Sequence, residues 1–311
     1  MSCRIGGRVK DVPFGTINVE VGANWVQHPN MKGVKDIPLD NLVKAAGLNL
    51  IPDDYEDYIF RYKGKNVTDE VNNIYDHFDD ILEESVKLME RKVEGKEPDI
   101  NYRAAFALLD WKPTHPIEKA MEYYEFDFEF ADEPEITSLE NTAAIFKDHG
   151  DDDLFIADNR GFAQIIRNMA EKIPLKEGKN IHFNNYINTI KYNEPGEYPI
   201  KVIANDTITG KVNTFTAKWV IVTFSIGVLK SDLVSFVPKL PAWKEEAISM
   251  FKMTRYIKIF VKFPASTESF WDENHYIMYV DPDVRGRYQV WQNLEARGKY
   301  YPKGRPICLS L

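Results

Sequence analysis

The sequence has few of the features that mark membrane proteins, metalloproteins or nucleic-acid-binding proteins. No stretch approaches the ~20 consecutive apolar residues of a membrane-spanning helix. The two cysteines, Cys3 and Cys308, lie at opposite ends of the chain, so they offer neither a metal-ligand spacing nor a disulfide framework. The six histidines lack ligand spacings such as H-E-x-x-H. A formal net charge of -9 argues against nucleic acid, which requires a basic surface, and favours a cationic ligand by electrostatic steering.

Several nucleotide-binding and hydrolase motifs are also absent. A dinucleotide-binding βαβ unit carries G-x-G-x-x-G between its first strand and its helix, and none of the 17 glycines forms that pattern. The sequence has no G-x-x-x-x-G-K-[ST] loop for phosphates and no G-x-S-x-G nucleophile elbow. It therefore gives no support to P-loop phosphoryl transfer or to serine hydrolase chemistry.

The composition is that of a globular protein with a sizeable core. The 311 residues are 44% apolar and 28% charged, which is enough for one or two domains. Apolar periodicity predicts a helix from Thr68, as its cap, to about Val93, and another from Pro116 to about Ala131. Shorter helices are predicted at 40–46, 100–109, 163–172 and 243–250. Strands are predicted at 58–62, 181–183, 186–192, 200–204, 214–224, 256–263, 276–280 and 288–291, which indicates an α+β protein.

The stretch Arg4–Gln27 combines three features that suit a large flat ligand. It opens with a glycine turn that carries the guanidinium groups of Arg4 and Arg8, and these suit phosphate or pyrophosphate. A strand-like alternation at 17–21 leads to two small residues, an amide and an indole: Gly22, Ala23, Asn24 and Trp25. Small residues let a backbone approach a planar ligand closely. On the residues alone, a glycine-rich turn before a buried strand, with surface arginines, is the simpler explanation.

R-x-G-G-R followed by G-A-N-W resembles the early signature of the flavin-containing amine oxidases, and VEVGANWVQ resembles their plant and fungal polyamine oxidase branch. Six further blocks are similar to polyamine oxidase segments in the same order: 123–142, 158–166, 187–190, 222–232, 236–248 and 256–264. The resemblance covers almost the whole chain. The family's dinucleotide unit and its last cofactor segment have no counterpart here. We therefore expect a chain truncated at both ends that holds little flavin by itself.

The resemblance implies FAD as the cofactor and oxygen as a second substrate. It implies a partial FAD-binding, Rossmann-like domain over 1–30 and 180–240, and a substrate domain with a mixed β-sheet flanked by helices over 31–179 and 241–311. The implied reaction moves a hydride from the carbon next to an amine nitrogen to flavin N5, giving an aldehyde, a smaller amine and hydrogen peroxide. The positions that match the family's cofactor contacts are Arg4, Arg8, Gly22, Ala23, Asn24, Trp25, Ile187 and Lys258.

Lys258 lies in a strand pattern, RYIKIFVKF, in which Tyr256, Lys258 and Lys262 share one face. On the residues alone this is an amphipathic strand with solvated lysines. In the family the matching lysine holds a water at flavin N5, and burial lowers the pKa of a lysine because desolvation disfavours its charge. The resemblance therefore makes Lys258 the predicted catalytic residue. It also places Tyr256 in the same substrate pocket and leaves Lys262 on the surface.

The acidic and aromatic block 123–135 permits two interpretations. It is either a solvated acidic helix face or a pocket for cations, since aromatic faces and carboxylates both attract ammonium groups. In polyamine oxidases the residues matching Glu129 and Phe130 border a tunnel for the polyamine, so we predict both as contacts of a spermidine- or spermine-like substrate. Gln27 stands where plant enzymes tend to have a glutamate, which puts substrate preference and activity in question. The neighbouring His28 is a candidate substitute.

Two alternatives to a polyamine oxidase stay open at this point. The first is an inactive fragment or pseudo-enzyme that serves as a binding module, and the missing dinucleotide unit motivates it. The second is another amine oxidase branch, acting on monoamines, amino acids or a methylated lysine. Neither a nucleic acid nor a membrane partner has positive support, and nothing in the sequence assigns a compartment.

Overall fold

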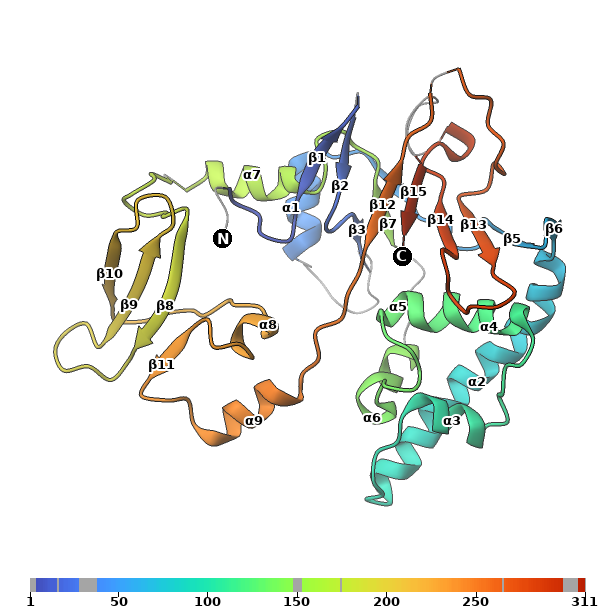
Figure 1. The fold of residues 1–311 in the computed structure, drawn as a ribbon, viewed down its shortest axis with the longest axis horizontal. Helices are drawn as coiled ribbons and strands as arrows, with labels where there is room; N and C mark the ends of the chain where they lie inside the picture. The colour runs from blue at the N-terminus through green and yellow to red at the C-terminus, as the bar shows by residue number, and fades with distance from the viewer. Residues whose placement is uncertain are drawn as a thin grey trace. The chain divides into compact units, whose positions relative to one another are not determined.

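The computed structural model describes residues 4–15, 17–27, 38–147, 153–173, 175–264, 266–298 and 307–310. Its fold is mixed α+β, as the sequence pattern indicates (Figure 1). The chain divides into two compact units. The first unit is Met1–Arg8 with Ile166–Thr254, and the second unit is Val9–Ile165 with Arg255–Leu311. The predicted FAD-binding and substrate domains are defined by the ligands that they would bind, so that division stays a prediction.

The first unit is built on a four-stranded sheet of order β10-β9-β8-β11. Its strands are β8 (Asn185–Lys191), β9 (Ile200–Asp206), β10 (Val212–Ala217) and β11 (Ser235–Val237). The first three run antiparallel, and β11 joins β8 in parallel. Asp206 fixes the turn from β9 to β10, because its Oδ1 accepts the amides of Ile208 and Thr209, both at 2.9 Å. Two short helices follow, α8 (Ile226–Leu229) and α9 (Ala242–Met250).

The first unit exposes an apolar segment beyond β10. The strand predicted over 214–224 is too long, because β10 ends at Ala217. Ala217 pairs with Ile200, the first residue of β9, so the partner strand supplies no backbone further along. The side chains of Trp219 and Ile221 that follow are 87% and 89% exposed. Strand propensity alone therefore does not extend β10 without a partner.

In the part of the chain that the structure describes, the second unit contains three sheets. A mixed sheet has the order β12-β15-β14-β13-β5-β6. Its strands are β5 (Tyr58–Tyr62), β6 (Lys65–Asn66), β12 (Lys258–Val261), β13 (Tyr276–Val280), β14 (Val290–Gln292) and β15 (Ile307–Ser310). A smaller sheet of order β3-β7-β4 joins β3 (Trp25–Val26), β4 (Leu50–Pro52) and β7 (Leu154–Ile156). A hairpin joins β1 (Asp11–Phe14) and β2 (Ile17–Glu20).

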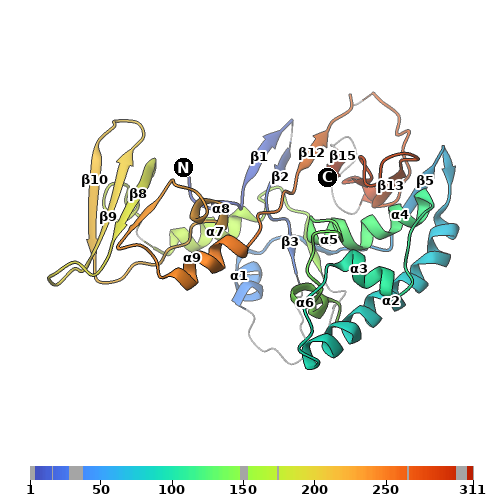
Figure 2. The same cartoon turned by 60° about the horizontal axis from the view of Figure 1, so that its bottom comes forward.

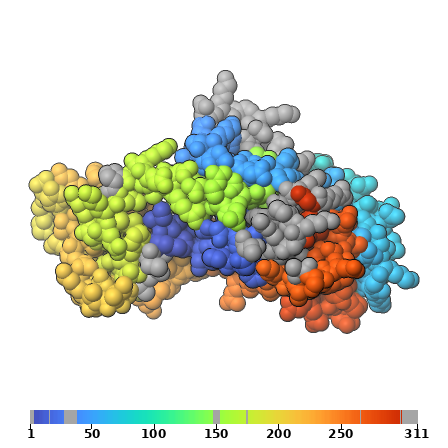
Figure 3. Space-filling view, turned by 90° about the horizontal axis from the view of Figure 1, so that it is seen from above, coloured from blue at the N-terminus to red at the C-terminus, as the bar shows by residue number. Residues whose placement is uncertain are grey.

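Helices of the second unit pack against the mixed sheet, with α2 on β5 and α4 on β13 (Figure 2). The bounds are α1 (Pro38–Ala46), α2 (Thr68–Glu94), α3 (Tyr102–Leu108), α4 (Pro116–Glu122), α5 (Phe128–Phe130) and α6 (Leu139–Thr142), with 3-10 turns at Ala143–Lys147 and Ala296–Gly298. Helix α7 (Ala163–Glu171) begins in the second unit and ends in the first. Strand β13 pairs with β5 in parallel, and in the space-filling view the orange part of the chain lies beside the cyan part (Figure 3). Among the described residues, no helix combines the length and apolarity that crossing a membrane requires.

Helix α2 confirms the predicted helical span but corrects the role of Thr68. The helix is preceded by Val67, which makes no capping hydrogen bond through its side chain, and Thr68 is the first helical residue. The Thr68 hydroxyl accepts the Phe60 amide at 3.0 Å and donates to Asn66 Oδ1 at 2.6 Å. The threonine therefore ties α2 to strand β5 instead of capping the helix. The buried stripe of helix α2, formed by Val71, Phe78, Ile81 and Leu82, follows the predicted spacing.

The helix predicted from Pro116 to about Ala131 is confirmed in its span, but its register changes at a π-helical turn. Helix α4 ends at Glu122, a π-helical turn occupies Tyr123–Asp127, and α5 ends at Phe130, followed by Ala131 in the left-handed region with φ 53°. A π-helical turn inserts a residue into the helical repeat, and such turns frequently occur at functional sites. The apolar periodicity does not reveal this insertion, because both sides of the turn keep a helical pattern.

Glu122 holds this helix junction together from inside the core. Its side chain has no exposure and accepts two hydrogen bonds from Arg103, at 2.7 and 2.8 Å, and one from Trp111 Nε1 at 2.8 Å. Arg285, between β13 and β14, donates a further bond at 2.6 Å and also pairs with Asp127. A buried carboxylate is tolerated only when such partners replace its lost hydration. The network therefore joins α3, α4 and the π-helical turn to the β13–β14 connection.

We expect Glu122→Ala to destabilise the protein by about 3–5 kcal/mol, because two arginines would lose their buried counter-charge. Urea unfolding at neutral pH measures this change. The control is Glu84→Ala, which removes an exposed 2.6 Å pair with Lys87 and is expected to leave the urea midpoint nearly unchanged. Equal midpoints for the two variants would contradict the role assigned to Glu122.

Candidate functional site

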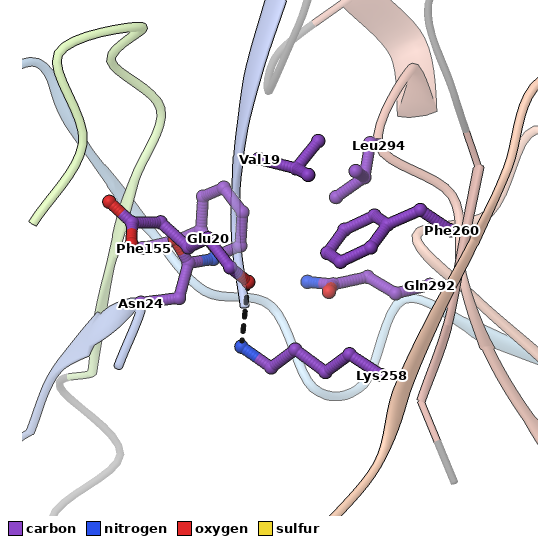
Figure 4. Close-up of a pocket in the computed structure, with 8 residues that line it drawn as sticks. All are labelled: Val19, Glu20, Asn24, Phe155, Lys258, Phe260, Gln292 and Leu294. Atoms are coloured by element: carbon purple, nitrogen blue, oxygen red, sulfur yellow. Dashed lines mark hydrogen bonds between the residues drawn. The ribbon is translucent and has the colours of Figure 1, made fainter. Parts of the chain in front are cut away.

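Lys258, the first residue of β12, connects to the segment that follows β2. Its Nζ donates to the Gly22 carbonyl at 2.7 Å. It also lies 3.5 Å from the Glu20 carbonyl, the contact dashed in Figure 4. The same atom lies 5.0 Å from the centre of the Trp25 ring, within the range of a cation–π contact. The structure therefore brings Lys258 together with part of the predicted Gly22–Trp25 ligand edge.

A small cavity lies beside this ammonium group and is called here the lysine cavity. Its volume is about 10 Å³, close to the room that one water molecule needs. It is lined by Val19, Glu20, Asn24, Phe155, Lys258, Phe260, Gln292 and Leu294 (Figure 4). Asn24 Oδ1 is buried and has no hydrogen-bond partner among the described residues. A cavity that combines an ammonium donor with an unsatisfied carbonyl acceptor suits a small polar ligand.

Glu20 forms one wall of the lysine cavity, and its side chain meets the start of α7. A Cβ atom at Gly161 would lie 1.9 Å from Glu20 Oε1, so a larger residue would displace this carboxylate, and the φ of +67° also favours glycine. Burial raises the pKa of Glu20 to about 7, and Asp11 raises it further, whereas the Phe162 and Ala163 amides and Lys258 oppose the rise only in part. Neither carboxylate oxygen has an ideal hydrogen-bond partner in the described residues. Glu20 therefore titrates close to neutral pH.

Trp25 is fixed by a hydrogen bond from its Nε1 to Asp53, which lies just beyond β4. Asp53 also accepts the Tyr276 hydroxyl at 3.2 Å, and the Trp25 ring packs edge-on against Phe155 at 5.6 Å. The indole beneath the Lys258 ammonium is thus held by a buried carboxylate and an aromatic neighbour.

The remaining predicted cofactor contacts belong partly to the first unit. Arg4 turns its guanidinium onto its own loop, donating to the Ile5 carbonyl at 2.9 Å and to the Gly7 carbonyl at 2.6 Å. Arg8 is exposed, and Ile187 is half-buried in β8 next to a bulge. In the second unit Gly22 is half-buried and Ala23 is exposed. The predicted contacts of these positions with the cofactor stay predictions.

A second cavity, of about 280 Å³, lies near Tyr256 and is called here the tyrosine cavity. Its lining residues are Tyr123, Asp127, Phe128, Ala131, Asp132, Glu133, Ile136, Arg255 and Tyr256. Tyr256 precedes β12, so the strand predicted from 256 begins too early, and its ring lies 6.1 Å from that of Phe128. The π-helical turn and the α5 segment after it supply Asp127 and Phe128 to this cavity.

Glu129 and Phe130 do not line the tyrosine cavity. Glu129 is exposed, and Phe130 packs on Phe126 and Phe146, with ring centres 4.8 and 5.4 Å apart. Gln27 is exposed at the end of β3, and His28 lies outside the described residues. The predicted substrate contacts are therefore brought together only in part.

Several lining residues were missed by sequence reasoning. Gln292 is a lone polar residue at the end of an apolar strand, a pattern that carries no functional signal. Glu20 stands in the predicted strand before Gly22, where alternation gave no reason to expect a buried carboxylate. Phe128 lies directly before the predicted contacts Glu129 and Phe130, and it lines the tyrosine cavity where they do not. The π-helical turn that precedes it could not be predicted from the apolar spacing. No group of three or more His, Cys, Asp or Glu within the described ranges is arranged to hold a metal ion.

Comparison with known proteins gives a consistent result. Residues 1–311 match the family model described as flavin containing amine oxidoreductase. The chain is 34% identical to polyamine oxidase 1 of Zea mays over 334 aligned residues, which cover 99% of this chain and 62% of that protein. It is 33% identical to polyamine oxidase 6 of Oryza sativa subsp. japonica, with coverages of 99% and 62%. The chain thus spans a little under two thirds of the length of these curated relatives.

We expect Glu20→Gln to flatten the dependence of stability on pH. A folded-state pKa raised from 4.5 to about 7 stabilises the protein fully below pH 4.5, and that contribution is lost as pH rises through 7. The loss is at most about 3.5 kcal/mol, from roughly 1.4 kcal/mol per pKa unit. Urea unfolding between pH 5 and 8 should show the wild type losing more stability than the variant, and parallel curves would contradict this assignment.

Proposed function

Because the chain belongs to the flavin-containing amine oxidoreductase family, we propose that it supplies the lysine side of an FAD-dependent amine oxidase site. One observation carries the proposal most directly. The Lys258 ammonium donates a hydrogen bond to the Gly22–Trp25 segment, and Lys258 lines the lysine cavity. The proposed reaction is oxidation of a polyamine to an aldehyde and a smaller amine, with oxygen reduced to hydrogen peroxide.

The residues at the lysine cavity fit the polar edge of a flavin ring. Asn24 Oδ1 is a buried acceptor without a partner in the described residues, and Lys258 is a donor at the same cavity. Half-buried Gly22 allows a planar ring to approach the backbone. We further propose that Arg4, Arg8 and Ile187 serve the phosphate and adenosine part of FAD, in a Rossmann-like domain over 1–30 and 180–240, with the substrate domain over 31–179 and 241–311.

The chemistry divides between the cofactor and the chain. When bound, FAD would supply the redox chemistry, which is acceptance of a hydride from the carbon next to the amine nitrogen and electron transfer to oxygen. Lys258 holds a water in the lysine cavity and keeps it oriented by donating a hydrogen bond. Trp25 stacks beneath the ammonium and shields it from bulk solvent, which strengthens every electrostatic interaction in the cavity.

A cationic substrate is supported by the composition of the tyrosine cavity. Tyr256 and Phe128 offer aromatic faces, and Asp132 and Glu133 add carboxylates to the lining. The two relatives reported above carry the name polyamine oxidase. We propose a spermidine- or spermine-like amine as substrate, with Tyr256, Glu129, Phe130 and Gln27 as its contacts. The neutral amide of Gln27 cannot form the ion pair that a glutamate forms.

An anaerobic titration of the purified chain with excess FAD tests the proposal. Excess FAD is needed because the absent G-x-G-x-x-G motif leads us to expect little flavin in the chain as purified. Bound flavin that is bleached by spermidine or spermine, and recovers on admission of oxygen with release of peroxide, is the expected signature of an amine oxidase. Bound flavin that stays oxidised with both polyamines would contradict a polyamine oxidase. A chain that takes up no FAD would instead favour the non-enzymatic binding module that the absent G-x-G-x-x-G motif raises.

A further inference from the structure

Asp53, His275 and Gln292 form a buried chain of polar side chains that ends at the lysine cavity. The side chains of Asp53 and His275 have no exposure, and His275 Nδ1 lies 3.1 Å from Asp53 Oδ1. On the other edge of the ring, Nε2 lies 2.9 Å from the side-chain nitrogen of Gln292. Gln292 is 3% exposed and lines the lysine cavity (Figure 4).

The backbone holds the histidine and the glutamine in a fixed register. Gln292 is the last residue of β14 and pairs with Tyr276, which follows His275. The His275 carbonyl accepts the Asn293 amide at 2.7 Å, and its own amide donates to Asp57 Oδ2 at 3.2 Å. The ring therefore has little freedom to turn away from either neighbour.

The chemistry of the three groups decides which way the Gln292 amide points. His275 Nδ1 faces Asp53 Oδ1 at a distance that allows a hydrogen bond, although the contact is not aligned as one in this structure. A carboxylate oxygen can only accept, so we infer that the facing Nδ1 carries the proton. In the neutral ring Nε2 is then an acceptor, and the Gln292 side chain must offer its NH₂ group to it. The amide oxygen of Gln292 is consequently left to accept hydrogen bonds from the lysine cavity.

Asp53 controls a second wall of the same cavity. Its carboxylate also accepts the Trp25 indole N–H, and the Trp25 ring lies 5.0 Å from the Lys258 ammonium. A single buried carboxylate thus fixes both the indole beneath Lys258 and, through His275, the amide opposite it. Removing its charge would affect both walls without touching any ligand.

We propose that Gln292 contacts the water held in the lysine cavity, and that Asp53 and His275 are positioning residues that fix its amide oxygen toward that water. The water accepts from Lys258 and donates to Asn24 Oδ1 and Gln292 Oε1. This gives three hydrogen bonds, the usual number for a buried water, in a cavity of about 10 Å³. The proposal rests on the proposed function for its catalytic meaning, because the same water would lie at the flavin edge.

NMR of the full chain labelled with ¹⁵N-histidine tests the positioning. His275 is expected as the neutral Nδ1–H tautomer, and Gln292→Leu should shift its Nε2 signal by removing the donor. Asp53→Asn should move the proton to Nε2, because an asparagine NH₂ can donate to Nδ1. The control is Gln289→Leu, since Gln289 is equally buried but donates to the Ala120 carbonyl at 2.6 Å. A His275 signal that Gln292→Leu leaves unchanged, or an Nε2–H tautomer in the wild type, would overturn the proposal.

A second NMR measurement on the same samples tests the contact between Gln292 and the water. A cross peak between water and the Gln292 side-chain amide is expected in the wild type and should disappear in Asn24→Leu, which removes one acceptor. The Gln289 amide should show no such peak. Absence of the Gln292 peak in the wild type would overturn the water contact. Both measurements are made without FAD, so their failure is distinguishable from failure of the proposed function, which the flavin titration decides.

Discussion

The hydrogen bond from the Lys258 ammonium to the Gly22 carbonyl is the contact on which the candidate site depends. It spans 236 positions in the sequence and brings the first residue of β12 to the segment after β2. A lysine is held at a backbone carbonyl only where the surrounding fold fixes both partners. The smaller sheet positions Trp25 and Phe155, and the mixed sheet positions Lys258 and Gln292. The lysine cavity therefore exists because the smaller sheet, the mixed sheet and the β1–β2 hairpin of the second unit meet there.

Three buried carboxylates of the second unit receive very different support. Glu122 accepts hydrogen bonds from two arginines and a tryptophan, and Asp53 accepts from an indole and a phenol beside His275. Glu20 has no such partners, and its pKa is raised to about 7. The first two stabilise the fold and hold other side chains in place. Glu20 instead carries a carboxylate that changes charge near neutral pH and points away from Lys258, toward Gly161 before α7 (Figure 4).

The sequence predicted those features that depend on local periodicity or on family motifs. The span of α2, the α+β class and the family follow from apolar spacing and ordered blocks. The π-helical turn at 123–127 and the early end of β10 were not predictable, because each depends on tertiary partners such as Arg285 or on a missing neighbour strand. Lys258 was predicted through the resemblance. Gln292, Asp53 and His275 were not, because isolated polar residues in strands and loops give no signal before the fold brings them together.

Chemical modification of lysines with and without FAD tests the central claim most directly. Acetylation of the whole chain, followed by mass spectrometry, reports the reactivity of each ammonium group separately. The account predicts that saturating FAD strongly slows modification of Lys258 and leaves Lys262, which is exposed one residue beyond the same strand, unchanged. Equal modification of Lys258 with and without FAD would contradict the claim that this lysine faces the flavin.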